Sequence, residues 1–587
     1  MGLPLLGRSL SSPGWSPRLR RQEPTEMHAP RRILPMLPMV MALAGGAVSQ
    51  SHLLTILGET GGEQSGRAVA SVGDANKDGW GDFAVGSELY SPTNKLYAGR
   101  VTLYSGRNGR LLWTKTGIGQ RDFLGCSVAG AGDVNKDGHA DVVVGARGVD
   151  KSAAFDVGSA IVYSGRDGSV LWQWFGDSLS DAFGSSVSGA GDVNKDGYAD
   201  VAVGAPSDDN NQRGDSGMVR VFSGQTGKPL WEANGDSTFD YLGWSVAGAG
   251  DTNNDGNDDV VVGTRQLGGT RTGYARILSG TNGNTLQTFA GTHSGSWLGY
   301  SVAGLGDVNK DGRSDVIVGE PKARLNSKAM AGGANVYSGI DGKRLWRVVG
   351  SAAGDELGTS VGAAGDINGD GNADFLVGAP LSDLAGMDAG VLLGYSGANG
   401  APLVTVRGSK ALVRLGSSCS GGLDMNDDGL PDFVVGSPHD SKNAGLAGKT
   451  ECYSPRRMPL TSDNQLVSLV KQASQNWAMD AGTKHASKAY FMLGSITGTK
   501  PGIKLGNVTL PLQYDPYTDL TIMFPNSPLL SGSLGVLDAS GRGTAKFNAV
   551  PQLPPALQGT LFWHAYIVFG AGPFDFASNA VPLLLAK

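Results

Sequence analysis

A nine-residue pattern, Asp-x-Asn-x-Asp-Gly-x-x-Asp, occurs seven times in this chain and constrains its fold more than any other feature. The copies begin at Asp74, Asp133, Asp192, Asp251, Asp307, Asp366 and Asp424, at intervals of 59, 59, 59, 56, 59 and 58 residues. Near-constant spacing of this size is typical of repeat architectures. The pattern therefore predicts one structural unit that is copied seven times.

Each unit is predicted to form four short antiparallel strands. Around the second motif the chain reads FLGCSVAGAGD, VVVGAR, GSAIVYSG (158–165) and SVLWQWFG (169–176). Short apolar runs alternate with Gly, Asp and Asn, and no segment keeps a helical period. A four-stranded sheet cannot bury both of its faces alone, so the units should pack face to face around an axis. We expect an all-β, seven-bladed β-propeller with each acidic loop between the first and second strands of a blade.

The last unit lacks a fourth strand, since the chain runs into RRMPL after Thr450–Ser454. The segment LLTILGETGGEQSG (53–66) aligns with the fourth strands of other units. The N-terminal strand should therefore complete the seventh blade, which would leave no open sheet edge in the ring.

The clearest repeats are AFGSSVSGAGD with VGAP (182–206) and ELGTSVGAAGD with VGAP (356–380). They resemble the FG-GAP repeats of integrin α subunits and of many secreted bacterial proteins, over roughly Leu53 to Pro455. The resemblance implies a seven-bladed propeller that carries Ca²⁺ at its blade loops. It also implies adhesion or scaffolding more often than catalysis.

The repeated motif has the chemistry of a calcium loop. Side-chain oxygens stand at positions 1, 3, 5 and 9, Gly at position 6 permits a tight turn, and the carbonyl of position 7 is a further donor. Position 12 is apolar, which excludes an EF-hand. Good turn residues alone are the alternative, but turns do not require a carboxylate at position 9 in every copy. We predict up to seven Ca²⁺ ions, held by Asp74, Asn76, Asp78 and Asp82; Asp133, Asn135, Asp137 and Asp141; Asp192, Asn194, Asp196 and Asp200; Asp251, Asn253, Asp255 and Asp259; Asp307, Asn309, Asp311 and Asp315; Asp366, Asn368, Asp370 and Asp374; and Asp424, Asn426, Asp428 and Asp432.

A partner surface is predicted on the face opposite the calcium loops. Just before the LG or FG of successive units stand four aromatic residues, Phe123, Phe183, Tyr241 and Trp297. In integrin α subunits the matching rim holds an aromatic cage around a partner's basic side chain, and these residues resemble it through a cation-π contact. The alternative is that the rings only plug the central channel. The expected partner is a protein or a glycan, and nothing in the chain predicts nucleic-acid binding.

Catalytic motifs are absent from the sequence. It contains no nucleophile elbow, no His-Glu-x-x-His and no phosphate loop, so we predict that the protein is not an enzyme. YSGRDGSVLW (163–172) resembles quinoprotein propeller repeats, but Trp113, Trp172, Trp231 and Trp346 are explained more simply as residues that pack blades together. A hydrolase, a lyase or a quinoprotein built from propeller loops, and a structural envelope component, remain alternatives.

Residues 1–50 are interpreted as a leader and signal peptide, with a start at Met27. Arg31 and Arg32 precede an apolar stretch that ends in small residues. A membrane anchor is the alternative, but the stretch is short and contains Pro35 and Pro38. We therefore expect a secreted or cell-surface protein with no transmembrane segment in the mature chain.

The propeller is assigned to residues 51–458 and a C-terminal β-sandwich to residues 459–587. The expected strands of this second module are 466–470, 475–479, 488–495, 520–524, 543–550, 560–569 and the terminal SNAVPLLL. Of the three cysteines, Cys419 and Cys452 should lie on the first and third strands of one blade, about 9–10 Å apart and beyond disulfide reach. We expect Cys126, Cys419 and Cys452 to be free thiols.

Overall fold

The computed structural model describes residues 50–151, 154–210, 213–266, 272–324, 328–426, 428–455, 460–462, 466–468, 474–499, 502–505, 508–548, 557, 560–569, 576–578 and 580–586. The predicted leader and signal peptide lie outside these residues, except for Gln50. Within the described part of the chain, no helix combines the length and the apolar composition that crossing a membrane requires.

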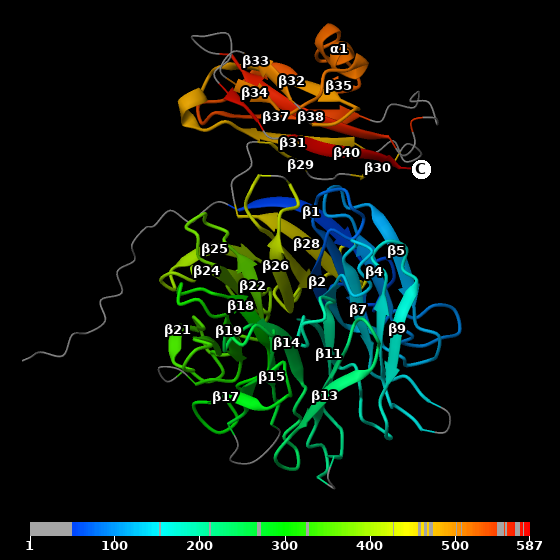
Figure 1. Ribbon diagram of the computed structural model, residues 1–587. Helices are drawn as coiled ribbons and strands as arrows, with labels where there is room; N and C mark the ends of the chain where they lie inside the picture. The colour runs from blue at the N-terminus through cyan, green and yellow to red at the C-terminus, as the bar shows by residue number, and fades with distance from the viewer. Residues whose placement is uncertain are drawn as a thin grey trace, which may run out of the picture. The chain divides into compact units, whose positions relative to one another are not determined.

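Seven four-stranded antiparallel sheets follow one another along the described chain, and each is one blade (Figure 1). Blades one to three consist of β2 (Ala68–Gly73), β3 (Asp82–Ser87), β4 (Arg100–Tyr104) and β5 (Leu111–Thr116); β6 (Leu124–Gly132), β7 (Asp141–Ala146), β8 (Ser159–Tyr163) and β9 (Val170–Phe175); and β10 (Ser186–Gly191), β11 (Asp200–Ala205), β12 (Met218–Phe222) and β13 (Pro229–Asn234). Blades four to six consist of β14 (Ser245–Gly250), β15 (Asp259–Gly263), β16 (Tyr274–Leu278) and β17 (Thr285–Ala290); β18 (Val302–Gly306), β19 (Asp315–Glu320), β20 (Gly333–Tyr337) and β21 (Arg344–Val349); and β22 (Ser360–Gly365), β23 (Asp374–Ala379), β24 (Val391–Tyr395) and β25 (Pro402–Arg407).

The seventh blade contains β26 (Ser418–Leu423), β27 (Asp432–Ser437) and β28 (Lys449–Ser454), and its fourth strand is the N-terminal β1 (Ser51–Leu57). Strand β1 pairs with β28 in antiparallel register, from Ser51 opposite Ser454 to Leu57 opposite Lys449. The first strand of each blade contacts the first strand of the next, and β26 contacts β2. The predicted closure of the ring by the N-terminal strand is confirmed.

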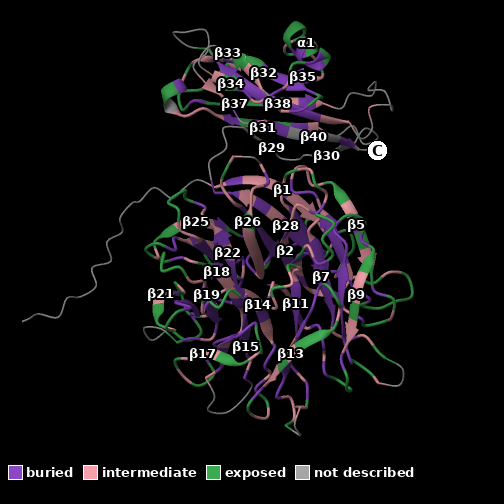
Figure 2. Ribbon diagram, in the orientation of Figure 1, coloured by how far each residue is buried: buried purple, intermediate pink, exposed green. Residues whose placement is uncertain are grey.

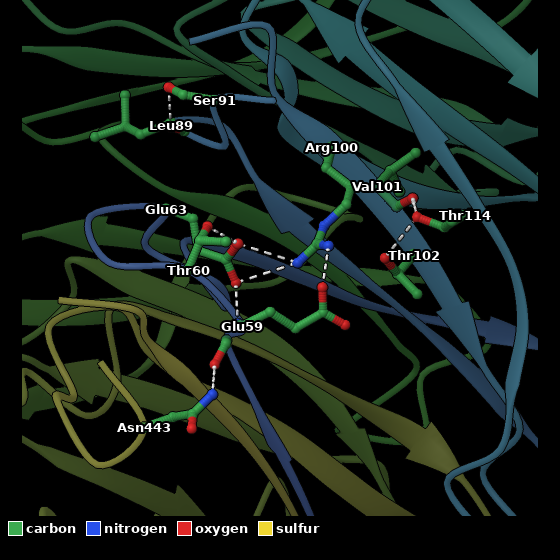
Figure 3. A network of polar contacts seen from close by, with 11 residues as sticks. Glu59, Thr60, Glu63, Leu89, Ser91, Arg100, Val101, Thr102, Thr114 and Asn443 are labelled. Carbon is green, nitrogen blue, oxygen red and sulfur yellow. Dashed lines mark hydrogen bonds and ion pairs between the residues drawn. The ribbon is translucent and has the colours of Figure 1, made fainter. Parts of the chain in front are cut away.

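An ion-pair network holds this closure (Figure 3). One guanidinium nitrogen of Arg100, on β4, lies 3.1 Å from both carboxylate oxygens of Glu63, and the other lies 2.7 Å from Glu59. Asn443 donates a hydrogen bond to the Gly58 carbonyl at 2.7 Å. The segment that follows β1 is thereby fixed to the first blade as well as to the seventh.

The second strand of each blade is buried throughout, as expected for short runs such as DVVVGA (Figure 2).

Two kinds of side-chain hydrogen bond recur between neighbouring blades. The indole N–H groups of Trp113, Trp172, Trp231 and Trp346 donate to a glycine carbonyl of the next blade at 2.6–3.0 Å. The interpretation of these tryptophans as blade-packing residues is confirmed.

The second kind of contact, which the sequence did not predict, is a series of hydrogen bonds from serines at the start of the first strands. The hydroxyls of Ser186, Ser245, Ser301, Ser360 and Ser418 each donate to the carbonyl of the LG, FG or equivalent glycine of the next blade, at 2.7–2.9 Å. The signal that could have revealed these hydrogen bonds is the recurring G-x-S, which begins at the glycine of each LG or FG pair.

The remaining elements lie in residues 460–586. One sheet has the order β29 (Leu460–Ser462), β31 (Ser474–Asp480), β37 (Arg542–Asn548), β35 (Leu530–Ser531). A second has the order β30 (Leu466–Ser468), β40 (Val581–Ala586), β38 (Leu561–Val568), β32 (Ala489–Ser495), β36 (Leu534–Val536), with β39 (Phe576–Ala577) beside β38. The two sheets share one core, which includes Trp477, Phe547 and Tyr566. Strands β33 (Ile503–Leu505) and β34 (Val508–Leu510) form a hairpin that the sequence did not lead us to expect.

The strand predicted at 520–524 is wrong, because Pro516–Met523 forms helix α1. Asp515 caps this helix, accepting the N–H groups of Tyr517 and Thr518, and Pro516 stands in the first turn. These start signals outweigh the short apolar run LTIMF. The three cysteines are free, as predicted, and β27 lies between the strands of Cys419 and Cys452.

Candidate metal loops and axial cavity

Each acidic loop folds around the oxygens of its first, third and fifth residues. In the second loop Asp133 accepts the N–H of Asp137 at 3.1 Å and that of Gly138 at 2.8 Å. Asn135 also accepts the N–H of Asp137, at 2.9 Å, so the oxygens of positions 1 and 3 converge on one point. The bond from position 6 to position 1 recurs in all seven loops. The seven motifs thus form one recurring loop structure.

The ninth residue of each loop is fully buried at the start of the second strand. Asp141 accepts the N–H of Val134 at 3.0 Å and, through its other oxygen, the N–H of Gly165 at 3.1 Å. The first of these bonds recurs in all seven loops and the second in six. This carboxylate ties the loop to the turn between the third and fourth strands. The fold alone therefore gives a reason for Asp at position 9, which we had attributed to metal.

Burial disfavours the charged form of the carboxylates at position 9. Burial, against the opposing backbone hydrogen bonds, raises the pKa of Asp82, Asp141 and Asp374 to about 7. The charges of the fifth residue, and of the first in most loops, add to the effect. Each loop therefore gathers several carboxylates and offers oxygen donors only, which suits a hard cation such as Ca²⁺.

The spacing of the carboxylates is looser than a filled site requires. Within the described residues, none of the seven loops brings three carboxylate oxygens within 4.8 Å of one another. Ligand oxygens on opposite sides of one Ca²⁺ lie at most about 5 Å apart, given bonds of about 2.3–2.6 Å. The residue types fit Ca²⁺, and binding would draw the side chains of positions 3 and 5, which are partly or fully exposed, inward.

A cavity of about 270 Å³ lies on the propeller axis, at the end of the first strands that is opposite the acidic loops. Its wall consists of the three residues that follow the LG or FG glycine in every blade. Trp244, Tyr300 and Arg67 stand in its outermost ring, while small serine and threonine side chains occupy other places there. The wall is therefore mainly polar, with two aromatic rings and one arginine, and Arg67 is itself paired with Glu88 at 3.4 Å.

The rim of this cavity carries three of the four predicted aromatic residues, and each already has a partner within the protein. Trp297 stacks on Tyr300 at 5.8 Å, and the guanidinium of Arg265 lies 4.9 Å from the Trp297 ring. The guanidinium of Arg147 lies 4.8 Å from the ring of Phe123. The Tyr241 hydroxyl lies 3.3 Å from a carboxylate oxygen of Asp215. The rings of Phe123 and Trp297, which we expected to receive a partner's cation, thus contact cations of this chain.

The inclusion of Phe183 in the partner face is wrong. Its side chain is fully buried in the core between blades two and three. It occupies the place of Leu124 and Leu242, pairing with Gly158 as they pair with Gly99 and Gly217. The rim position of this blade is Ala182, whose φ of 54° matches the φ of 54° at Phe123. Phe183 stands directly before Gly184, where other copies have Leu directly before Gly. An alignment on these glycines would have placed Phe183 in the core.

A closed ring of seven four-stranded blades with a recurring acidic loop defines the class, a seven-bladed β-propeller with candidate cation-binding loops. The family model of the FG-GAP repeat matches residues 183–222, 298–335 and 357–401. The chain thus contains FG-GAP repeats in these segments and is similar to integrin α chains over part of its length.

Curated relatives agree with this assignment over part of the chain. Integrin alpha-5 of Xenopus laevis is 28% identical over 278 residues, which is 42% of this chain and 26% of the relative. Integrin alpha-8 of Gallus gallus is 32% identical over 250 residues, 40% of this chain and 22% of the relative. Phosphatidylinositol-glycan-specific phospholipase D of Homo sapiens is 29% identical over 369 residues, 54% of this chain and 43% of the relative. The match spans less than half the length of each of these relatives.

Proposed function

We infer that this chain is an exported, calcium-loaded FG-GAP propeller that acts as an adhesion or ligand-binding protein at the cell surface or outside the cell. The observation that carries the inference is the axial cavity with its aromatic and cationic wall, on the face opposite the acidic loops. Binding sites are typically concave and orient their ligand through a few placed polar groups, and the polar lining of this cavity supplies such groups. The similarity to integrin α chains adds support for binding as the role of this face.

Arg265 gives this face its chemical preference. Its guanidinium lies 4.3 Å from the ring of Trp244, and its buried Nε has no hydrogen-bond partner among the described residues. Stacking against an aromatic ring leaves the N–H edge of a guanidinium available for a carboxylate. We expect a protein or glycan ligand that presents a carboxylate, rather than a partner with a basic side chain.

Calcium is assigned to the seven acidic loops through positions 1, 3, 5 and 9. A bound Ca²⁺ would neutralise the carboxylates that the fold holds together in each loop. Because the buried ninth residue ties the loop to the next turn, a filled loop would stiffen the blade at that end. Binding to the native state alone raises stability by RT ln(1 + [L]/Kd) for each site.

The ligand-binding part of the proposal is tested with a glycan and protein array on the purified, Ca²⁺-loaded chain. Ligands that bind are then tested against Arg265→Gln and Trp297→Ala. The matched controls are Lys136→Gln and Tyr198→Ala, which alter another cation-π pair, at 4.1 Å, in the acidic loops. We expect the first two variants to lose binding with their melting temperature retained. Binding that survives in them, or that the control variants lose equally, would contradict the assigned face.

One comparison favours a second candidate function, since a phospholipase D specific for phosphatidylinositol glycan is among the relatives. Incubation of the full chain with a phosphatidylinositol-glycan substrate, with and without Ca²⁺, tests it. Release of the glycan at a rate above that of a heat-denatured control would establish an enzyme. No release would leave ligand binding as the function that the cavity supports.

A further inference from the structure

Three residues meet at the same place where each blade joins its neighbour. One precedes the rim residue in the loop that enters the blade, one lies in the loop between the second and third strands, and one begins the third strand. The alignment rests on a shared hydrogen bond, in which Gly217 donates to the Asp208 carbonyl as Gly99 donates to Tyr90 and Gly448 to Asp440. The triplets of blades one, three, four and seven are Glu63, Tyr90 and Arg100; Asp181, Asp208 and Met218; Asp240, Gln266 and Tyr274; and Val413, Asp440 and Lys449.

In three of these four blades, the acid of the triplet is bonded by a cation or by hydrogen-bond donors from the same triplet. Arg100 bonds both oxygens of Glu63, and Lys449 lies 3.4 Å from an oxygen of Asp440. In blade four Asp240 accepts hydrogen bonds from Gln266 at 2.9 Å and from the Tyr274 hydroxyl at 3.1 Å. In these three blades the buried carboxylate is thus supplied with a cation or with neutral donors, which offsets the cost of its burial.

Blade three has two acids and no such partner. Asp181 is 1% exposed and Asp208 is 3% exposed, and the buried thioether of Met218 occupies the place of Arg100 and Lys449. One oxygen of each acid accepts a backbone N–H, from Ser178 and Asn210 respectively. The other oxygens, Oδ1 of Asp181 and Oδ2 of Asp208, are buried and have no hydrogen-bond partner.

A third carboxylate, that of the exposed Asp177, completes the group. Asp177, Asp181 and Asp208 each offer an oxygen within 4.8 Å of the other two. The nearby Arg220 bonds Asp177 at 3.0 Å but divides its charge with Glu232, at 2.9 Å. The negative charge of the cluster therefore exceeds the positive charge that the described side chains supply.

We propose that Asp177, Asp181 and Asp208 bind a hard divalent cation of the Ca²⁺ class at the junction that leads into blade three, separately from the seven acidic loops. All three ligands are carboxylate oxygens, their mutual distances match the span of one Ca²⁺ coordination sphere, and one exposed member gives the ion an entry side. The ion performs in this blade the role that Arg100 performs in blade one.

The test is the calcium content of the full chain, measured by equilibrium dialysis and elemental analysis at millimolar Ca²⁺. The double variant Asp181→Asn/Asp208→Asn should hold about one Ca²⁺ fewer than the unmodified chain. Asp122→Asn, at the same place in blade two, should hold as many as the unmodified chain. Equal calcium content in all three proteins would overturn the proposal, even if the acidic loops bind Ca²⁺ normally.

A second variant supplies the missing charge and guards against misfolding of the first. Met218→Lys introduces an ammonium where blade seven has Lys449. It should raise the melting temperature in chelator and reduce the further rise that Ca²⁺ produces. If the two acids instead share a proton or a water molecule, the Ca²⁺-induced rise will equal that of the unmodified chain, and the cation site is refuted.

Discussion

The junctions that lead into blades one and three handle buried acids in opposite ways. In blade one the Glu63 side chain is fully buried and is bonded by Arg100, which is itself 12% exposed (Figure 3). In blade three Asp181 and Asp208 are almost as buried, but the third strand begins with Met218. The backbone hydrogen bond is the same in both places, but blade three has Asp208 where blade one has Tyr90, and Met218 where blade one has Arg100.

This difference indicates that equivalent junctions of one repeat fold depend on dissolved ions to different degrees. A guanidinium is a permanent partner, so the junction that closes the ring is independent of ions. An acid pair without a side-chain cation depends on what the solvent supplies, because isolated buried charges are costly. The closure of the ring is thus held by the protein itself, whereas the junction of blade three is expected to respond to metal.

The largest effect is expected from removal of the closing strand. Deletion of Leu53–Gly58 would expose the edge of β28. Unpaired strand edges promote further pairing, so the product should aggregate or elute as oligomers. Size-exclusion chromatography with light scattering provides the measurement. A soluble monomer of unchanged stability would refute the closure.

The next largest effect is expected from Arg100→Met, which makes the blade-one junction resemble that of blade three. The variant leaves Glu63 buried without its partner, and loss of one member of a buried pair costs about 3–5 kcal/mol. The double variant Arg100→Met/Glu63→Gln should recover most of this loss in urea unfolding. Glu59→Gln is the control, because Glu59 is 65% exposed and its pair contributes about 1 kcal/mol or less. Equal losses for Arg100→Met and Glu59→Gln would remove the contrast between the junctions.

A smaller loss is expected from Lys449→Met in blade seven. Lys449 is buried and serves both Asp440 and Glu451, but Lys410 also lies 3.6 Å from Asp440. The second cation should limit the cost to about 1–3 kcal/mol, the range for a buried group that loses part of its hydrogen bonding. Urea unfolding of the variant, compared with Lys410→Met, measures it. A loss as large as that of Arg100→Met would show that Lys410 does not compensate.

The smallest effect concerns Asp515, a third arrangement in which neutral donors alone satisfy an acid. Burial by itself would raise the pKa of Asp515, but hydrogen bonds from Ser495, Thr518 and neighbouring backbone groups lower it to about 2. A lowered pKa adds stability that is complete above the ordinary value of about 3.9 and is lost as the pH falls towards 2. Asp515→Asn should cost about 1 kcal/mol near neutral pH.

Hydrogen exchange over residues 495–524 provides the measurement for Asp515. In the unmodified chain this segment should lose protection between pH 4 and 2, and Asp515→Asn should remove most of that pH dependence. Protection that declines equally in both proteins would show that another group controls the acid response.

The spacing of the motifs was sufficient to predict the blades, their number and the closing strand, because a period of about 59 residues and an absent fourth strand are visible in the letters alone. The sequence did not separate the two roles of position 9. Asp141 serves the fold through the N–H groups of Val134 and Gly165, and neither bond is visible without the register of the strands.

Where prediction failed, a local signal was overruled by its context. LTIMF has the composition of a strand, yet Asp515 and Pro516 start a helix just before it. Phe183 is aromatic like Tyr241, but the glycine that follows it fixes it in the core. The cluster of Asp177, Asp181 and Asp208 joins two different loops, so that only the folded chain brings it together.

The central claim, that calcium is part of the native propeller, is tested most directly by one paired measurement on the full chain. The melting temperature and the bound calcium are determined in chelator and again in millimolar Ca²⁺. We predict several Ca²⁺ per chain and a clearly higher melting temperature with the metal, because each occupied site stabilises only the folded state. An identical melting temperature in both conditions, with no calcium bound, would contradict the account.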